Sequence, residues 1–339
     1  MGKTSAPSLN TYALNMKFLL IAFVVTANII EPMIDRSSPL FALYETIYSF
    51  HIPMFALAMG YFAKSFRLDR PGIDGLCTIA YQYVLFQTLY SLADIVFFQA
   101  KGVIHSFFMP YSLLWFLLSH FCWRLLLRAF VHMRHPLIVS LLLGIAVGYL
   151  PWPGAWLSVS RTLVYFPFFL AGYFLPQHWE TIVKRLRMPA VLLGIGVICF
   201  FWLGGRIDPR WLYGSFTYAE AGHPEWYAGI YRLGMYGVQA AASLAFLSLV
   251  PWAASRITDW GKRTGYVFLL HAFILKSLLA AGIYVYLQTP WSQGLAIIAG
   301  FGIVWLLSQP WVEAHAKRWF EPDITFVKRL VLKSHGTPQ

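Results

Sequence analysis

The amino-acid sequence predicts an all-α, polytopic membrane protein with about ten transmembrane helices and both termini in the cytoplasm. Composition is the first reason. Of the 339 residues, 58% are hydrophobic and only 12% are charged, whereas a soluble protein carries about 25% charged residues. The second reason is the mean hydropathy of +0.59, which is high enough for a membrane protein. The third reason is arrangement, because long apolar runs alternate with short basic segments.

A helix that crosses a bilayer needs about 20 largely apolar residues, and this length defines the expected spans. We expect them near 12–30, 39–63, 74–98, 108–130, 136–150, 160–176, 189–205, 232–251, 264–286 and 292–312. The fifth and sixth runs are short and interrupted by Gly and Pro, so the sequence defines their ends least sharply.

The charges of the loops predict the orientation. Most of the 26 Lys and Arg residues lie at the N-terminus, in alternate loops or in the C-terminal tail. These basic residues are Lys3; Lys64, Arg67, Arg70; Arg124, Arg128, Arg134; Lys184, Arg185, Arg187; Arg256, Lys262, Arg263; and Lys317, Arg318, Lys328, Arg329, Lys333. The opposite loops contain only Arg36, Lys101, Arg206 and Arg210. Because positive residues favour the cytoplasmic side, both termini are expected there.

The same reasoning fixes the expected domains and partners. Residues 1–315 form a single transmembrane helical domain, and residues 316–339 form a basic cytoplasmic tail. The net charge of +12 follows from membrane topology, so the expected partner is the lipid bilayer and not nucleic acid.

One outer loop, 204–231, is longer than the others and rich in Gly, Pro and aromatic residues. It also carries Asp208, Glu220, His223 and Glu225. Two interpretations remain open. The loop is either a partly ordered connector with interfacial aromatics, or a lid that receives a polar acceptor such as a sugar.

The stretch 48–62 reads YSFHIPMFALAMGYF and carries His51 and Pro53 inside an apolar run. Both residues are costly in a helix that only has to cross lipid. Either His51 is a packed, hydrogen-bonded histidine beside a tolerated kink, or this helix carries a reactive centre.

Other predicted spans contain ionisable residues as well. The full set is Lys17, Glu45, His51, Asp94, His120, Arg161, Arg232, His271 and Lys276. A charge at the bilayer centre costs at least about 2.5 kcal/mol, so this number of charges indicates a polar cavity. Structural roles are the alternative for some: Lys17 reaches the cytoplasmic interface, Lys276 pairs with a carboxylate, and His120 is packed.

Four stretches in order resemble the integral-membrane acyltransferase-3 family, especially its fucose O-acetylase-like branch. They read NMKFLLIAFVVTANIIEPM (15–33), IYSFHIPMFALAMGYFAK (47–64), SRTLVYFPFFLAGYFL (160–175) and WGKRTGYVFLLHAFILK (260–276). PYSLLWFLLSHF (110–121) is a weaker match. The resemblance implies a ten-helix bundle in the bacterial cytoplasmic (cell) membrane. It also implies transfer of an acyl group, usually acetyl, from a cytoplasmic thioester to a hydroxyl of an extracytoplasmic glycan or glycolipid.

The chain departs from this family at one position. The first helix of the family usually has a basic residue followed, eleven positions later, by a catalytic His. Lys17 matches the basic position, and Asn28 stands where the His is expected. An amide does not titrate in the useful range, so Asn28 cannot be a general base. His51 and His271 match other histidines of the family, and imidazole suits proton transfer near neutral pH.

The resemblance also implies acyl-CoA (acetyl-CoA) as the donor substrate, with no tightly bound cofactor. Lys17 is one candidate residue for binding this donor. The pair Arg67 and Arg70 is similar to a pair of arginines three apart near the third helix of the family, which implies a role in holding the phosphates of coenzyme A, as guanidinium groups do. The two arginines equally fit a basic cytoplasmic loop. The sequence contains no Gly-rich nucleotide loop and no metal-ligand cluster, so no metal site is expected.

The first hypothesis is therefore a membrane O-acyltransferase. His51 or His271 takes the proton of the acceptor hydroxyl, and Arg161 or Asn28 stabilises the charge on the carbonyl oxygen. The second hypothesis is a transporter or flippase for a glycan, and the third is a catalytically altered scaffold. Asn28 supports both alternatives, because neither needs a proton acceptor there.

Overall fold

The computed structural model describes residues 9–35, 38–98, 105–151, 156–176, 178–204 and 207–320. Every regular element in these ranges is a helix, which confirms the all-α class. Within the described ranges, five segments are long and apolar enough to cross a membrane, as expected of a membrane protein: Asn10–Met33, Pro39–Ser65, Ser112–Phe130, Arg256–Ala280 and Pro290–Leu307. The full set of about ten spans and the cytoplasmic termini stay predictions. Arg36, Lys101, Arg206 and residues 321–339 of the predicted tail lie outside the described residues.

Each expected span overlaps one of the longer helices. These helices are α1 (Leu9–Ile30), α2 (Pro39–Phe62), α3 (Arg70–Val96), α4 (Trp115–Phe130), α5 (Pro136–Ala146), α6 (Val159–Tyr173), α8 (Arg187–Trp202), α10 (Ala228–Leu249), α12 (Thr264–Ala280) and α13 (Pro290–Leu307). Four shorter helices complete the set: α7 (Trp179–Arg185), α9 (Pro209–Tyr213), α11 (Arg256–Trp260) and α14 (Pro310–Phe320). Helix α14 runs through position 315, where the predicted domain meets the predicted tail.

Several helices begin at signals that the sequence shows directly. Ser38, Asp69 and Thr289 each accept a hydrogen bond from a backbone N–H in the first turn of the following helix, at 3.3, 3.0 and 3.2 Å. A proline stands in the first two positions of α2, α3 and α13, where no backbone N–H is needed. These caps set where three of the long apolar helices start.

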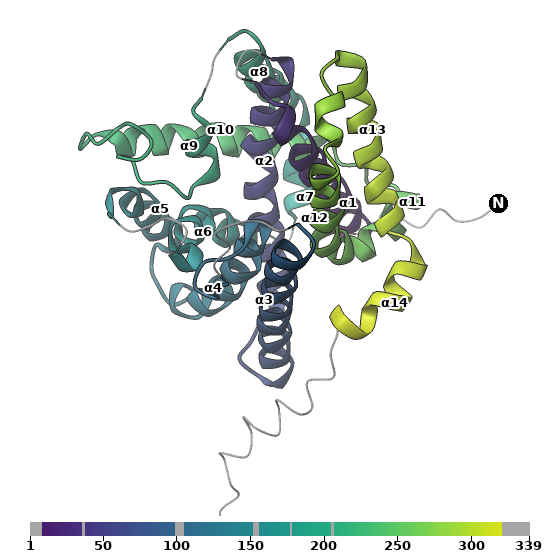
Figure 1. Cartoon of the computed structure of the whole chain (residues 1–339). Helices are drawn as coiled ribbons and strands as arrows, with labels where there is room; N and C mark the ends of the chain where they lie inside the picture. The colour runs from purple at the N-terminus through teal and green to yellow at the C-terminus, as the bar shows by residue number, and fades with distance from the viewer. Residues whose placement is uncertain are drawn as a thin grey trace, which may run out of the picture.

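Helix α2 is the central element of the bundle. In Figure 1 it stands between the group formed by α4, α5 and α6 and the group formed by α12, α13 and α14. It contacts α1, α6, α8 and α10. Its closest approach is to α6, where two glycines face the partner backbone. A Cβ atom at Gly60 would lie 1.8 Å from the Phe169 carbonyl oxygen, and one at Gly172 would lie 1.9 Å from that of Leu57. The two backbones therefore touch, as small residues permit in membrane helix pairs.

A buried ion pair connects α3 and α12. Lys276 Nζ lies 2.5 Å from the Asp94 carboxylate, which confirms the pairing expected for Lys276. The Tyr111 hydroxyl donates a hydrogen bond to the same carboxylate. The lysine also lies 4.2 Å from the centre of the Tyr111 ring. These contacts neutralise a charge that would be costly inside a bilayer.

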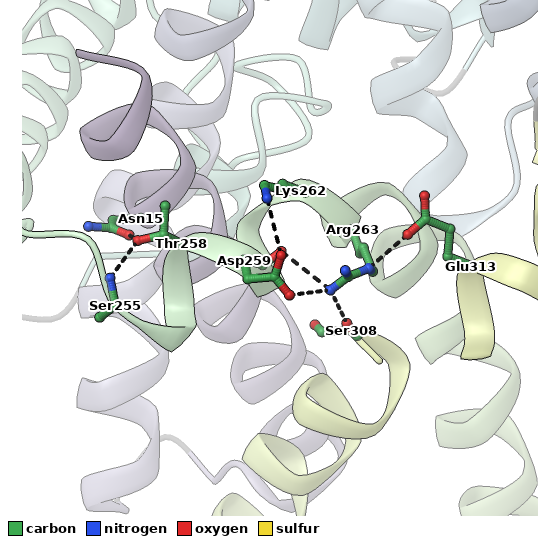
Figure 2. A network of polar contacts seen from close by, with 8 residues as sticks. All are labelled: Asn15, Ser255, Thr258, Asp259, Lys262, Arg263, Ser308 and Glu313. Carbon is green, nitrogen blue, oxygen red and sulfur yellow. Dashed lines mark hydrogen bonds and ion pairs between the residues drawn. The ribbon is translucent and has the colours of Figure 1, made fainter. Parts of the chain in front are cut away.

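A second polar network fixes the start of α12 (Figure 2). Arg263 lies between two carboxylates, donating from Nε to Glu313 at 2.8 Å and from Nη1 to Asp259 at 2.9 Å. Thr258 donates to the Asn15 side-chain oxygen at 2.6 Å. The network thus ties α1, α11 and α14 to the residue that precedes α12.

The close approach of α2 and α6 leads to a test of stability. We expect Gly60→Ala and Gly172→Ala each to destabilise the protein by about 1–3 kcal/mol, because the new methyl group forces the two backbones apart. Gly237→Ala on α10 is the matched control, since no atom lies within 4 Å of a Cβ there. It should be neutral or stabilising by up to about 1 kcal/mol. Thermal unfolding of the detergent-solubilised protein measures the three changes, and equal effects would contradict the described crossing.

The buried ion pair leads to a second test. Lys276→Met leaves the Asp94 carboxylate unpaired with a side-chain exposure of 8%, so we expect a loss of about 2–4 kcal/mol in thermal unfolding. Adding Asp94→Asn should recover part of the loss. Lys262→Met is the control, because its pair with Asp259 is 60% and 50% exposed and is worth at most about 1 kcal/mol. A Lys276→Met protein no less stable than the control would show that the buried pair does not form.

Candidate functional site

A cavity of about 380 Å³ lies between α1, α2, α4, α6 and α12. Helix α1 lines it with a stripe that contains Lys17, Ile21, Val24 and Asn28, and Glu31 continues the stripe from the 3₁₀ turn that directly follows α1. Their spacing of three or four residues places them on one helix face. At 1.5 Å per residue the stripe is about 20 Å long, which is about two thirds of a bilayer's hydrocarbon core. We call its two limits the Lys17 end and the Glu31 end.

Helix α2 lines the cavity with a second stripe. It consists of Tyr48, His51, Ile52, Phe55 and Met59. Except for the neighbours His51 and Ile52, successive members are again three or four residues apart. His51 is thus one of the cavity residues although only 5% of its surface is exposed. The residue predicted from the sequence to mark a reactive centre therefore lies at a cavity.

The hydrogen bond of His51 determines which of its nitrogens carries the proton. Its Nδ1 lies 2.8 Å from the carbonyl oxygen of Ile47. A carbonyl oxygen can only accept, so Nδ1 donates and the neutral ring has its lone pair on Nε2. The ring also packs edge-on against Tyr48, with 4.6 Å between the centroids. Both contacts hold the imidazole in one orientation, with Nε2 as the proton acceptor.

His271 lies behind Asn28 and does not line the cavity. It is fully buried, and its Nδ1 lies 2.8 Å from the Val267 carbonyl oxygen. The Nε2 atom lies 3.2 Å from the Asn28 amide nitrogen. By the same reasoning Nδ1 donates to the carbonyl, so Nε2 accepts the Asn28 N–H. The structure thus brings two predicted site residues together and uses the free lone pair of His271 to hold Asn28.

Arg161 lines the cavity from the first turn of α6. Its guanidinium carbon lies 4.9 Å from the centre of the Trp115 ring. Two residues with left-handed backbone precede it, Leu157 at φ 49° and Ser158 at φ 50°. The cavity residue Ser112 also has a positive φ, 39°. Such strain in non-glycine residues costs about 1–3 kcal/mol each and tends to occur at functional sites.

The predicted outer loop forms the wall at the Glu31 end. Its short helix α9 places Tyr213 in the cavity. The Tyr213 hydroxyl lies 2.8 Å from that of Tyr44, and its ring lies 5.3 Å from the ring of Tyr48. Burial raises the pKa of the Tyr213 phenol, so it stays protonated near neutral pH. Glu45 anchors the loop by accepting the Ile207 backbone N–H at 2.8 Å. Residues 207–231 of the loop are therefore held against the Glu31 end of the cavity.

The residues predicted to bind a donor separate into two groups. Lys17 lines the cavity, together with His120. The His120 Nε2 accepts a hydrogen bond from Arg124 Nε at 3.2 Å. His120, interpreted from the sequence as a packed residue, is therefore both hydrogen-bonded and part of the cavity lining. Arg67 and Arg70 are exposed and do not line the cavity. Their role in donor binding stays a prediction.

Sequence reasoning missed other polar residues of the cavity, among them Glu31, Tyr48, Ser112 and Tyr213. Two of them had a signal. Glu31 follows the first apolar run directly, and Tyr48 lies one helical turn before His51. Ser112 and Tyr213 had none, because they reach the cavity from segments outside the helices that carry the predicted site. Among the described residues, no group of three His, Cys, Asp or Glu side chains is placed to hold a metal ion.

In comparisons with known proteins, no family model, curated protein or solved structure matches the chain. The resemblance to the acyltransferase-3 family thus stays a prediction from the quoted residues.

The contact between Asn28 and His271 can be tested by a double-mutant cycle. We expect Asn28→Ala and His271→Ala to destabilise the protein by less together than the sum of their separate effects, with a coupling of about 0.5–1.5 kcal/mol. Asn28→Ala combined with His315→Ala is the control, because His315 is exposed on α14. That pair should be additive in thermal unfolding. Additive behaviour of the first pair would contradict the hydrogen bond.

Proposed function

We propose that the chain is a membrane O-acyltransferase with about ten transmembrane helices and cytoplasmic termini, located in the bacterial cell membrane. It transfers an acyl group, in the first instance acetyl, from cytoplasmic acyl-CoA to a hydroxyl of an extracytoplasmic glycan or glycolipid. One observation carries the proposal: a single cavity between apolar helices is lined by His51, Asn28 and Arg161. These side chains supply a base and two donors for a developing oxyanion.

The proposed reaction has two steps. In the first, His51 Nε2 takes the proton of the acceptor hydroxyl while the oxygen attacks the thioester carbonyl carbon. In the second, the tetrahedral intermediate collapses and the carbon–sulfur bond breaks. The departing thiolate then takes from His51 the proton that came from the acceptor hydroxyl. The net products are an ester and a free thiol. A positioned base of this kind is worth about 10²–10⁴-fold in rate.

Hydrogen bonding favours His51 over His271 as the base. Both rings donate from Nδ1 to a carbonyl oxygen. The Nε2 of His271 already accepts the Asn28 amide, and His271 does not line the cavity. We therefore assign His271 a positioning role, in which it holds the Asn28 amide at the cavity wall.

Two residues are suited to stabilise the oxyanion. Asn28 has a second amide hydrogen beyond the one given to His271. Arg161 supplies a permanent positive charge held above the Trp115 ring. An oxyanion donor is worth about 10²–10³-fold in rate, so both are expected to matter more for turnover than for stability.

The two ends of the cavity differ in a way that suits two substrates. At the Lys17 end, the lysine provides positive charge for an anionic donor, and Arg124 adds a second charge beside the cavity residue His120. At the Glu31 end, the rings of Tyr48 and Tyr213 and the carboxylate of Glu31 suit a sugar. The volume of about 380 Å³ lies in the range of small-ligand pockets.

Glycan transport is the second candidate function. The length of the Lys17–Glu31 stripe favours it, because a conduit has to reach most of the way across a bilayer. Asn28 favours it too, since transport needs no base. The cavity volume favours the enzyme, because it suits a small ligand better than a polymer. A catalytically altered scaffold would keep the fold and have neither activity.

Acyl transfer can be measured directly. Membranes that contain the protein are incubated with acetyl-labelled acetyl-CoA, and alkali-labile label is counted in the glycan and glycolipid fractions. We expect His51→Gln to reduce this label by about 10²–10⁴-fold, because the base is lost. His315→Gln is the matched control and should retain full activity, since this histidine is exposed on α14. His271→Gln should fall between the two.

Three outcomes separate the candidate functions. Unchanged labelling in both His51→Ala and His271→Ala would remove the proposed base. Loss of glycan export in a deletion strain, with product acylation unchanged, would indicate a transporter. A gain of acyl transfer in Asn28→His, starting from a protein without measurable transfer, would indicate a scaffold derived from an enzyme.

A further inference from the structure

A second cavity, of about 480 Å³, has a set of lining residues of its own. It is formed where α7 meets α8 and where α10 ends. Its polar lining consists of Lys184, Arg187 and Ser248, and its apolar lining includes Val183 and Trp252. None of these residues lines the cavity assigned to acyl transfer.

Within the described ranges, no carboxylate neutralises the two cations at this cavity. Both Lys184 and Arg187 are exposed, and neither forms an ion pair with the part of the chain that the structure describes. Glu180 lies one helical turn before Lys184 on α7 and forms no ion pair with it. The cavity therefore presents uncompensated positive charge, which fits a negatively charged ligand.

The floor of the cavity is a fixed aromatic surface. Lys184 Nζ lies 4.6 Å from the centre of the Trp252 ring. That ring packs on Tyr12 at 4.0 Å and lies 6.1 Å from Trp179. The Tyr12 hydroxyl in turn donates to the Leu247 carbonyl oxygen at 2.6 Å. Tryptophan and tyrosine gathered beside basic residues are typical of the level of lipid headgroups.

The surface next to the cavity is apolar and faces outward. Met188 and Leu192 on α8 are 70% and 61% exposed, and Leu249 at the end of α10 is 62% exposed. Leu249 itself lines the cavity, so this apolar surface begins at the cavity. A ligand that complements both the basic cavity and the adjoining apolar surface has an anionic head and a long apolar tail.

We propose that this cavity binds an anionic phospholipid. The phosphate group lies between Lys184 and Arg187, and the acyl chains lie along the exposed face of α8. The expected leaflet is the cytoplasmic one, because 184–187 belongs to a basic loop that the charge pattern assigns to that side. Basic pockets between helices at this level bind anionic headgroups.

The test compares lipids and variants in the full-length protein in detergent micelles. Binding of a fluorescent phosphatidylglycerol is titrated, with the same probe carrying a phosphatidylcholine headgroup as the reference. We expect Lys184→Gln and Arg187→Gln each to weaken phosphatidylglycerol binding about fivefold, and the double variant about 25-fold. Lys184→Arg should bind as the natural protein does, which distinguishes loss of charge from loss of fold.

The matched control is the double variant Arg128→Gln/Arg134→Gln. These arginines are also exposed on the predicted cytoplasmic side, but they do not line the cavity. Their variant should bind phosphatidylglycerol unchanged. The proposal is overturned if this control weakens binding as much as the Lys184/Arg187 pair. It is also overturned if phosphatidylcholine binds equally well, or if millimolar inorganic phosphate displaces the lipid probe, since that would identify a site for free phosphate.

Discussion

A polar side chain inside a bilayer has no water to bond with, so the protein itself or an enclosed cavity must satisfy it. The structure contains both solutions. Asp94 and Lys276 neutralise each other between α3 and α12, and Tyr111 completes the hydrogen bonding of the carboxylate. His51 and Arg161 instead line a cavity. The first arrangement holds helices together, whereas the second leaves polar atoms available to a ligand. This difference is why the functional proposal rests on the cavity residues and not on the ion pair.

The packing of α2 against α6 determines which residues share that cavity. Gly60 and Gly172 let the backbones of α2 and α6 touch near the C-terminal ends of both helices. Arg161 lies at the start of α6 and His51 lies near the middle of α2. A bulkier residue at the crossing would widen the distance between these helices and change the shape of the cavity between them. Small residues far from the proposed chemistry therefore set its geometry.

Sequence patterns predicted the helices well because an apolar run of sufficient length has few other structures available to it in a bilayer. They also indicated Lys17, His51 and Arg161 as ionisable residues of the spans, and the family resemblance drew attention to Asn28; all four line one cavity. The sequence could not show that His271 lies behind Asn28, because that depends on how α12 rotates against α1. Nor could it show that α9 delivers Tyr213, since a loop's path is set by distant anchors such as Glu45.

The hydrogen bonds around Asn28 give a physical reason for an amide at this position. A neutral imidazole has one donor and one acceptor, and His271 uses both, on the Val267 carbonyl and the Asn28 amide. A histidine at position 28 could satisfy His271 only by donating an N–H to it, and this would fix the tautomer of the histidine at position 28. Asparagine donates without that constraint and keeps a second N–H for another partner. In the proposed reaction, the amide therefore suits a cavity wall that binds an oxygen atom, and proton transfer is assigned to His51, whose Nε2 accepts no hydrogen bond from the described residues.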